Sequence, residues 1–294
     1  METIQAKSIL SPYHEGDQWF GGNYTCNLYR GCCHGCIYCD SRSACYGIED
    51  FDTVRAKKGA IPLLRRELKA KRRGGIVFAG AMSDPYNPFE RSLNLTRQSL
   101  EAVRDYGFGV ALTTKSDLVT RDIDLLLEIK RHAPALVLLT VTTVEDSLSR
   151  RIEPNAPPLS RRFAALEELS RAGIFAGILM TPVLPFLEDT TENVRAMAER
   201  TSGCGGKFLY AQFGVTLRQN QRDYFYKQLD RLFPGLSARY RRQYGDRYFC
   251  QSPQAPALSQ CCREECRARG LLSSQKEIIS AYQDGYEPEQ LRFF

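Results

Sequence analysis

The sequence predicts an α/β protein built on a parallel sheet, and two observations support this fold class. Short apolar segments alternate with segments whose apolar residues recur at helical spacing, giving six strand-helix repeats of about thirty residues each. A parallel strand needs a crossover of this length before the next strand can pair with it. The predicted strands are also apolar almost throughout, as a sheet covered on both faces requires. The alternation fits an open doubly wound sheet and a barrel equally well.

The predicted strands follow in order along the chain. The first lies within residues 19–29, where β-forming residues mix with glycines. The others are expected at residues 75–80, 108–114, 136–142, 175–180 and 207–213. Between them, these sets of apolar residues each share one helical face: Ile61, Leu64 and Leu68; Leu93, Leu100 and Val103; Ile123, Leu126 and Leu127; Leu166, Leu169 and Ala172; Val194, Met197 and Ala198.

Local signals predict where several of these helices begin and end. Pro62 suits the first turn of a helix, and Gly173 is expected to stop the helix that precedes it. Asp189 with Glu192 predicts a capping box at the start of the next helix. The last helix of the series is expected over residues 220–232.

Composition narrows the class of protein. The chain has 294 residues, 43% of them hydrophobic, and can bury the core of one barrel or of two ordinary domains. No apolar run approaches the roughly 18 residues of a membrane span, and the first residues lack the charge order of a signal peptide. We therefore expect a cytoplasmic protein with no membrane partner. Thiols stay reduced in that compartment, so clustered members of the eleven cysteines are predicted to be metal ligands.

Three cysteines stand at the spacing C-x3-C-x2-C in a glycine-containing loop: Cys32, Cys36 and Cys39. A closed structural zinc site takes four ligands, whereas a [4Fe-4S] cluster held by three thiolates leaves one iron open to a small molecule. Cys33 offers a competing C-x2-C-x2-C register, but Tyr38 directly before the last cysteine favours the first one. A zinc knuckle completed by His34 or Cys33 is the alternative.

This spacing resembles the cluster motif of the radical S-adenosylmethionine superfamily, in which an aromatic residue precedes the last cysteine. The resemblance implies that Cys32, Cys36 and Cys39 hold a [4Fe-4S] cluster whose open iron binds S-adenosylmethionine. An electron from the cluster would split the sulfonium to give a 5'-deoxyadenosyl radical. The resemblance also implies an incomplete (β/α)6 barrel over residues 1–235, with residues 236–294 as a cysteine-containing C-terminal extension.

The segments just after the predicted strands are unusually polar, and the carboxyl ends of parallel strands form the active face of a barrel. These segments resemble the spore photoproduct lyase branch of the superfamily. The resemblance implies that Ser83 and Asp84 bind the amino group of the cofactor methionine, while Lys115 and Thr142 face its carboxylate and ribose. Ala81 stands where the lyase has a hydrogen-donating cysteine, so repair of thymine dimers by that route is not expected.

A second group of thiols lies in a segment rich in Pro, Gln and Ser, which we expect to be a loop: Cys250, Cys261, Cys262 and Cys266. Their spacing fits a second iron-sulfur cluster and zinc equally well. Residues 251–256 have little apolar surface to bury, so a metal would be needed to order them. Thiols without a ligand are the alternative.

The formal charge of +6 is concentrated in one segment. Between Gly214 and Phe249 there are eight Lys or Arg residues against three Asp, which gives +5. Basic residues interleaved with aromatic ones can hold phosphates and stack on bases, so nucleic acid is a candidate partner. The alternative is a solvated helical face whose aromatic residues belong to the core. The aromatic residues concerned are Tyr224, Phe225, Tyr226, Tyr240, Tyr244 and Tyr248.

The leading functional hypothesis is a radical S-adenosylmethionine enzyme that abstracts hydrogen from an unidentified substrate and takes electrons from a reductant such as flavodoxin or ferredoxin. Within the same superfamily, modification or repair of nucleic acid is the second hypothesis. A different class is also open: a non-catalytic, zinc-dependent nucleic-acid-binding module that uses the two cysteine groups as knuckles.

Overall fold

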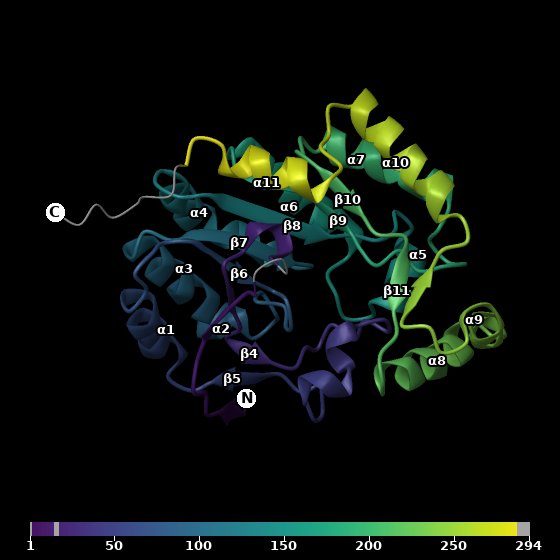
Figure 1. Ribbon diagram of the computed structural model, residues 1–294, viewed down its shortest axis with the longest axis horizontal. Coiled ribbons are helices and arrows are strands. Elements are labelled where there is room, and N and C mark those ends of the chain that lie inside the picture. Colours follow the sequence, from purple (N-terminus) through teal and green to yellow (C-terminus); the bar gives the residue numbers. More distant parts are fainter. Residues whose placement is uncertain (1, 15–17, 287–294) are drawn as a thin grey trace.

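The centre of the fold is a seven-stranded sheet, seen in a computed structural model that describes residues 2–14 and 18–286 (Figure 1). Its strands are β2 (Leu10–Pro12), β3 (Tyr24–Cys26), β6 (Ile76–Ala79), β7 (Gly109–Thr114), β8 (Ala135–Thr140), β9 (Phe175–Met180) and β10 (Leu209–Ala211). They are ordered β10-β9-β8-β7-β6-β3-β2, and only the edge strand β2 is antiparallel to its neighbour. The α/β class with a mostly parallel sheet is confirmed.

The strand order shows how the chain winds. Each parallel strand lies beside the one that precedes it in this series, whereas a doubly wound sheet reverses direction at a switch point. All crossovers therefore run the same way and place their helices on one side of the sheet. These helices follow one another around the outside of the sheet in Figure 1: α1 (Ala60–Lys69), α3 (Leu95–Asp105), α4 (Ile123–Lys130), α6 (Leu159–Arg171) and α7 (Thr191–Gly203).

The sheet is buried on both faces because each strand is apolar at successive positions. Val77, Val110 and Val137 point into the core between the sheet and the outer helices. Phe78 and Leu138 belong to a second core on the opposite face. This inner core is closed by a short 3-10 turn, η1 (Trp19–Gly21), and by the late helix α11 (Gln275–Gln283). The inner face is therefore filled by side chains of the protein.

Several predicted boundaries need correction. Only residues 24–26 of the predicted first strand pair as β3, since residues 19–21 form η1. The strand predicted over 136–142 ends at Thr140, and that over 207–213 is limited to 209–211. The helix expected around Leu93 is split into α2 (Glu90–Leu93) and α3. The capping box is wrong: Thr190 caps α7 by accepting from Asn193 N, and Asp189 instead accepts from Phe186 N.

The chain after β10 is more regular than the sequence suggested. The strands β11 (Gly214–Thr216) and β12 (Phe249–Gln251) pair in antiparallel fashion. The chain between them forms the helices α8 (Gln221–Leu232) and α9 (Leu236–Tyr244). The segment predicted to be a cysteine-containing loop is instead α10 (Ala255–Ala268), which packs against α7. Pro256 sits in the first turn of α10, where a missing N–H costs nothing. None of the described helices has the length and apolar character that crossing a membrane would demand.

Candidate active site

The loop of residues 32–39 carries three of the predicted cluster ligands. It connects β4 (Tyr29–Arg30), which belongs to a small separate sheet with β1 (Thr3–Ile4) and β5 (Arg55–Lys57), to the 3-10 turn η2 (Asp40–Arg42). Backbone hydrogen bonds fix it from three directions: Cys32 N donates to Phe51 O at 2.8 Å, Ile37 N to Ile152 O at 2.9 Å and Asn155 N to His34 O at 3.0 Å. These hydrogen bonds fix the loop against residues 51 and 152–155.

Two glycines let this loop pass close to other segments. Gly31 has φ +80°, and a Cβ on it would lie 2.3 Å from Thr53 O. Gly35 has φ +71°, and a Cβ on it would touch the ring of Pro154 at 3.1 Å. Only glycine combines a left-handed backbone with such close approach. The loop backbone thereby runs close to Thr53 at one end and to Pro154 in its middle.

Burial governs the chemistry of these thiols. It raises the pKa of Cys32 and of Cys36 to about 12, and that of Cys39 to about 11. For Cys32 the nearby Asp84 acts in the same direction, while Lys115 opposes the effect at Cys36. Thiolates are the form that binds metal, so metal binding at these cysteines would be accompanied by release of their protons.

Ser83 and Asp84 follow β6 and reach the cysteine loop. Ser83 Oγ donates to Gly31 O at 2.5 Å, immediately before Cys32. Asp84 Oδ2 lies 3.5 Å from His34 Nδ1 inside the loop. Burial lowers the pKa of His34 more than Asp84 raises it, so His34 is neutral. Asp84 thus faces only the Nδ1 side of the ring, as a carboxylate commonly does beside a metal-bound histidine, so this contact leaves the zinc-knuckle alternative with His34 open.

Asp84 also joins two strand ends. Its Oδ1 accepts from Thr114 Oγ1 at 2.6 Å and from Tyr86 N at 2.9 Å, and its Oδ2 accepts from Lys115 N at 2.8 Å. The carboxylate therefore connects the end of β6 with the end of β7 and with the cysteine loop. Ser83, Asp84 and Lys115, which the sequence predicted to act together, do lie together.

Lys115 belongs to a buried charge cluster that the sequence did not indicate. Its Nζ lies 3.9 Å from Glu153 Oε1 and 5.6 Å from the ring centre of Tyr38. Tyr38 donates its hydroxyl to Glu153, and Arg162 Nη1 donates to Glu153 Oε2 at 2.6 Å. Burial disfavours the charged form of Lys115, but Cys36 and Glu153 outweigh it and raise its pKa. The ammonium therefore stays charged beside the cysteine loop.

Thr142 lies just past the end of β8 and is joined to another carboxyl group. Thr142 Oγ1 donates to Glu188 Oε1 at 2.5 Å, and Leu184 N donates to Glu188 Oε2 at 2.8 Å. Burial raises the pKa of Glu188 to about 8. Thr142 is thus on the same edge of the sheet as Lys115, but its hydroxyl is directed to Glu188.

Sequence reasoning missed three residues of this edge. Glu153 was visible only as part of a polar segment after the fourth strand, and Glu188 lies next to the residue that was taken for a helix cap. Arg162 had no signal, because it occupies the buried face of α6 between apolar residues. Arg162 Nη1 and Nε also donate to Thr140 O and Pro157 O, which fixes it below the strand end.

The tail cysteines are divided between two parts of the core. Cys250, on β12, packs with Cys36 and Tyr38. The other three lie on α10 in the core that includes α7, and the sulfurs of Cys262 and Cys266 are 4.0 Å apart, one helical turn from each other. Among residues 2–14 and 18–286, no three His, Cys, Asp or Glu side chains converge on one point as ligands of a single ion. A cubane does not need such convergence, because it spreads its thiolates over three irons.

The aromatic residues of the basic segment mostly serve the core. Phe225, Tyr226, Tyr240 and Tyr244 are buried with the cysteine loop in one cluster. The guanidinium of Arg42 lies 4.0 Å from the ring centre of Tyr224. Only Tyr248 of the six is largely exposed, at 52%. This arrangement matches the alternative of a solvated helical face with aromatic residues in the core.

The residues present suit a three-thiolate cubane. One buried thiol, Cys36, and two partly buried ones, Cys32 and Cys39, share one short loop, and the charge of Lys115 acts on Cys36. Cys32, Cys36 and Cys39 would hold such a cluster, and with S-adenosylmethionine it would supply one-electron reductive cleavage of the sulfonium. The protein's part is to hold the thiols, to provide charged and polar groups at the strand ends and to keep water out.

Comparisons with known proteins agree with this geometry. The model of a family described as the radical S-adenosylmethionine superfamily matches residues 26–198. An uncharacterized protein of Mycobacterium tuberculosis is 31% identical over 228 residues, covering 75% of this chain and 67% of the relative. Another, of Methanocaldococcus jannaschii, is 34% identical over 188 residues, covering 63% of this chain and 68% of the relative.

Among solved structures, spore photoproduct lyase complexed with a dinucleoside spore photoproduct has a similar fold. The TM-score is 0.67 at 14% identity, covering 92% of this chain and 80% of the lyase. At this identity the likeness concerns the fold alone. The family model covers more than half of the chain, and the matched residues include the cysteine loop and most of the parallel sheet. The chain therefore belongs to the radical S-adenosylmethionine superfamily and is a radical S-adenosylmethionine enzyme.

Proposed function

We propose that the chain binds one [4Fe-4S] cluster through Cys32, Cys36 and Cys39, cleaves S-adenosylmethionine reductively to a 5'-deoxyadenosyl radical and abstracts hydrogen from its substrate. The observation that carries this proposal is the direct connection of the three-thiol loop to the strand ends, through Ser83 to Gly31 and through Asp84 to His34. The six parallel strands then correspond to an incomplete (β/α)6 barrel, and residues 236–294 to its C-terminal extension.

The cofactor pocket follows from the same residues. Lys115 is a buried cation and is suited to the carboxylate of the cofactor methionine, while Ser83 and Thr142 offer hydroxyl groups at neighbouring strand ends. Asp84 has a second task, because its oxygens already accept from Thr114, Tyr86 and Lys115. Asp84 therefore supports the wall of the pocket. Only the lone pairs of its carboxylate that these donors do not use can accept from the amino group of the cofactor methionine.

The test is reductive cleavage with dithionite under anaerobic conditions, measured as 5'-deoxyadenosine formed per protein. Wild type reconstituted with iron and sulfide is expected to be brown and active, and Cys36→Ala is expected to lose both the colour and the product. Cys45→Ala is the matched control, because Cys45 is an exposed thiol outside the motif. Turnover that survives in Cys36→Ala, or colourless wild type that retains zinc, would contradict the proposal.

Modification or repair of nucleic acid is the second candidate within this superfamily, and the excess of cations between Gly214 and Phe249 favours it. Its test is retention of single-stranded DNA by the holoenzyme. The non-catalytic zinc module is set aside, because membership of the superfamily makes the chain an enzyme.

The tail cysteines remain a proposed second site for an iron-sulfur cluster or zinc. Among the four tail cysteines, Cys262 and Cys266 give this second site its best support, because they lie one helical turn apart and their sulfurs are 4.0 Å from each other. Cys250 would have to reach this pair from another part of the core.

A further inference from the structure

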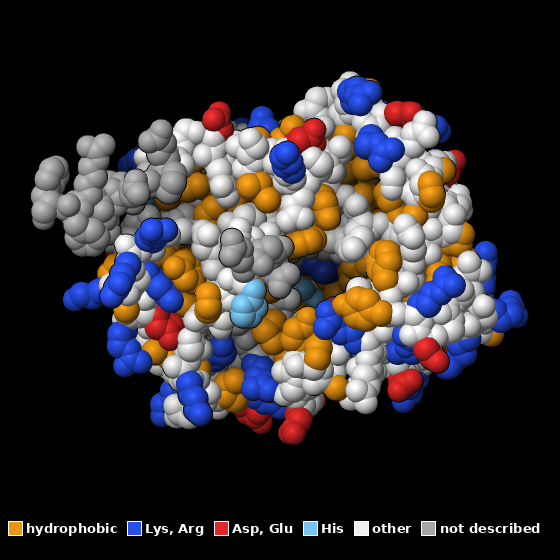
Figure 2. Space-filling view, in the orientation of Figure 1, with side chains coloured by type: hydrophobic (Ala, Val, Ile, Leu, Met, Phe, Trp, Pro, Cys, Tyr) orange, Lys and Arg blue, Asp and Glu red, His pale blue; other side chains and the backbone are white. Residues whose placement is uncertain are grey.

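The segment that forms α8 and α9 carries an excess of cations over carboxylates. Of the eight Lys and Arg residues between Gly214 and Phe249, Arg218 pairs with Asp40 at 3.0 Å, and the other seven form no ion pair within the part of the chain that the structure describes. We call these seven the cationic surface: Arg222, Lys227, Arg231, Arg239, Arg241, Arg242 and Arg247. Figure 2 shows Lys and Arg side chains gathered over α8 and α9 at the lower right.

Outside this segment the sequence is nearly balanced, with 32 Lys and Arg residues against 31 Asp and Glu. Arg65 pairs with Asp105, and Arg104 with Glu128, both at 2.8 Å or less. The imbalance is therefore local to the cationic surface and is not a general property of the protein. Uncompensated charges on one face steer an oppositely charged partner toward that face.

Aromatic rings hold several of these cations in place. The guanidinium of Arg239 lies 3.8 Å from the ring centre of Phe186, and that of Arg241 lies 4.5 Å from that of Tyr226. Such stacking orders the side chains before any partner arrives, which lowers the entropy lost on binding. Most rings of this segment, Tyr226 among them, are buried and are not open to the bases of a single-stranded nucleic acid. An acidic protein surface is thus a better match than nucleic acid.

The cationic surface is backed directly by the cysteine loop. Gln221, at the start of α8, donates from Nε2 to Tyr38 O at 2.9 Å in the interior. Phe225 and Leu229 of α8 pack in the same cluster as Cys36 and Tyr38. Arg42, whose backbone N donates to Cys39 O at 3.2 Å, stacks on Tyr224 of α8. A protein bound on this surface would be separated from the loop by one helix and the side chains beneath it.

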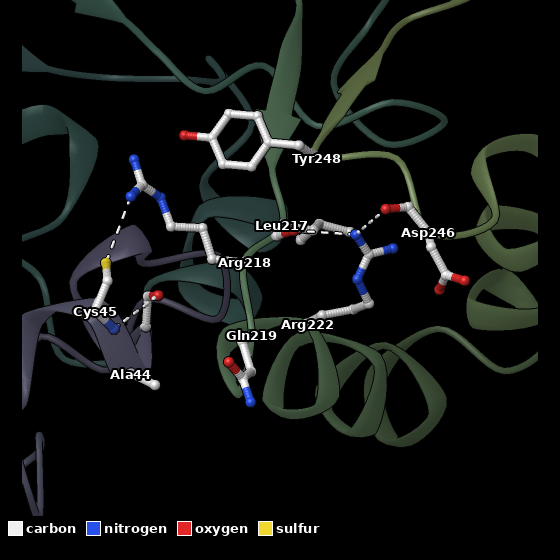
Figure 3. A pocket seen from close by; sticks show the side chains of 9 residues that line it. Ala44, Cys45, Leu217, Arg218, Gln219, Arg222, Asp246 and Tyr248 are labelled. Atoms are coloured by element: carbon white, nitrogen blue, oxygen red, sulfur yellow. Dashed lines mark hydrogen bonds between the residues drawn. The ribbon is translucent and has the colours of Figure 1, made fainter.

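A shallow depression of about 610 Å³ lies at the edge of this surface (Figure 3). Its lining comes from the turn η3 (Ala44–Tyr46), the start of α8 and the turn before β12. Arg222 crosses its centre and donates to the carbonyls of Leu217, Gly245 and Asp246, while the exposed ring of Tyr248 stands at its rim. The predicted cofactor residues do not line it, so this depression is separate from the strand-end site.

We propose that the cationic surface is the docking site of an acidic electron-transfer protein of the flavodoxin class. This inference rests on the proposed function, because it gives the docked protein the task of passing one electron to the cluster held by the loop of residues 32–39. The donor flavin is oxidised by one electron and the cluster is reduced by one. No bond is formed or broken in the transfer.

The test compares two triple variants of the holoenzyme. Arg231→Glu with Arg242→Glu and Arg247→Glu reverses three exposed charges of the cationic surface. The matched control carries the same reversals at three exposed cations over the outer helices that form no ion pair among the described residues, Arg66, Lys69 and Arg131. Binding of purified flavodoxin is measured by calorimetry at low and at high ionic strength. We expect the surface variant to bind at least about tenfold more weakly at low ionic strength, and the control to bind like wild type.

Turnover separates docking from chemistry. With dithionite, both variants should form 5'-deoxyadenosine at the wild-type rate; with limiting flavodoxin and its reductase, only the surface variant should be slow. Wild-type affinity in the surface variant, equal weakening in the control, or no binding of flavodoxin to wild type would each overturn the docking proposal. Loss of single-stranded DNA binding with unchanged flavodoxin binding would assign the surface to nucleic acid. Absence of product from wild type with dithionite would instead overturn the proposed function, and the calorimetry would still decide the docking site.

Discussion

Replacing Arg162 tests the buried charge cluster behind the cysteine loop. The side chains of Arg162 and Glu153 are both 1% exposed, and Arg162 Nη1 donates to Glu153 Oε2 at 2.6 Å. Arg162→Met keeps much of the side-chain volume but leaves Glu153 with only Tyr38 and the more distant Lys115. It also removes the donors to Thr140 O and Pro157 O.

The expected cost is large because an unpaired charge would remain buried. Removing one partner of a buried ion pair typically costs about 3–5 kcal/mol. For 294 residues the entropy of unfolding is roughly 0.6 kcal/mol per degree, so about 4 kcal/mol lowers the Tm by about 7 °C. Glu153→Gln with Arg162→Met removes both charges and should recover more than half of this loss.

The pH dependence gives a second check. Burial alone would raise the pKa of Glu153, but Arg162 and Lys115 outweigh it and hold the pKa below its ordinary 4.5. The stabilisation of Glu153 is therefore present above pH 4.5 and is lost as the pH falls through the lowered folded-state value. Arg162→Met removes most of the lowering, so its deficit against wild type should be full at neutral pH and should shrink on acidification. The double variant should lack this dependence.

The assay is thermal unfolding of the anaerobic holoenzyme by circular dichroism between neutral and mildly acidic pH. Arg171→Met is the control, since Arg171 forms an exposed pair with Glu167 and should change the Tm by about 1 °C or less. A fall of less than about 2 °C in Arg162→Met, or a double variant no more stable than the single one, would show that the pair does not stabilise the fold as reasoned.

Three further predictions concern the strand ends and the tail. Lys115→Ala should weaken binding of S-adenosylmethionine roughly a hundredfold at unchanged iron content, measured by equilibrium dialysis, and Asp84→Ala should weaken it similarly; unchanged affinity in both would misplace the pocket. Glu188 has a pKa raised by burial to about 8, so the protein should lose stability as the pH rises from about 4.5 to 8, and Glu188→Gln should flatten this decline in chemical unfolding; an equal slope would contradict the assignment. Cys250→Ala with Cys266→Ala should remove about four irons or one zinc by metal analysis, and unchanged metal content would eliminate the second site.

The sequence by itself determined the features that depend on local spacing. Apolar runs at a thirty-residue repeat were enough to predict the parallel α/β class, and four of the predicted strands agree with β6 to β9 within a few residues. The spacing of Cys32, Cys36 and Cys39 was enough to predict the family. The polar segments that contain Ser83 and Lys115 were predicted to lie at one edge because the carboxyl ends of parallel strands share that edge, and the resemblance to the lyase branch implied the roles of these two residues.

Other features were decided only by tertiary structure. The end of the loop predicted for residues 251–256 is already the first turn of the helix α10. This helix forms because its apolar side packs on α7, which lies more than fifty residues earlier in the chain. Thr190 caps α7 because Asp189 is taken by Phe186 N and by Ser252. In the sequence Arg162 is an ordinary residue of a helix. Only the tertiary structure places its guanidinium against Glu153, which also lies near Lys115. Local periodicity specifies which face of an element is buried, but the charges that meet there depend on which elements pack together, and no short-range pattern encodes that choice.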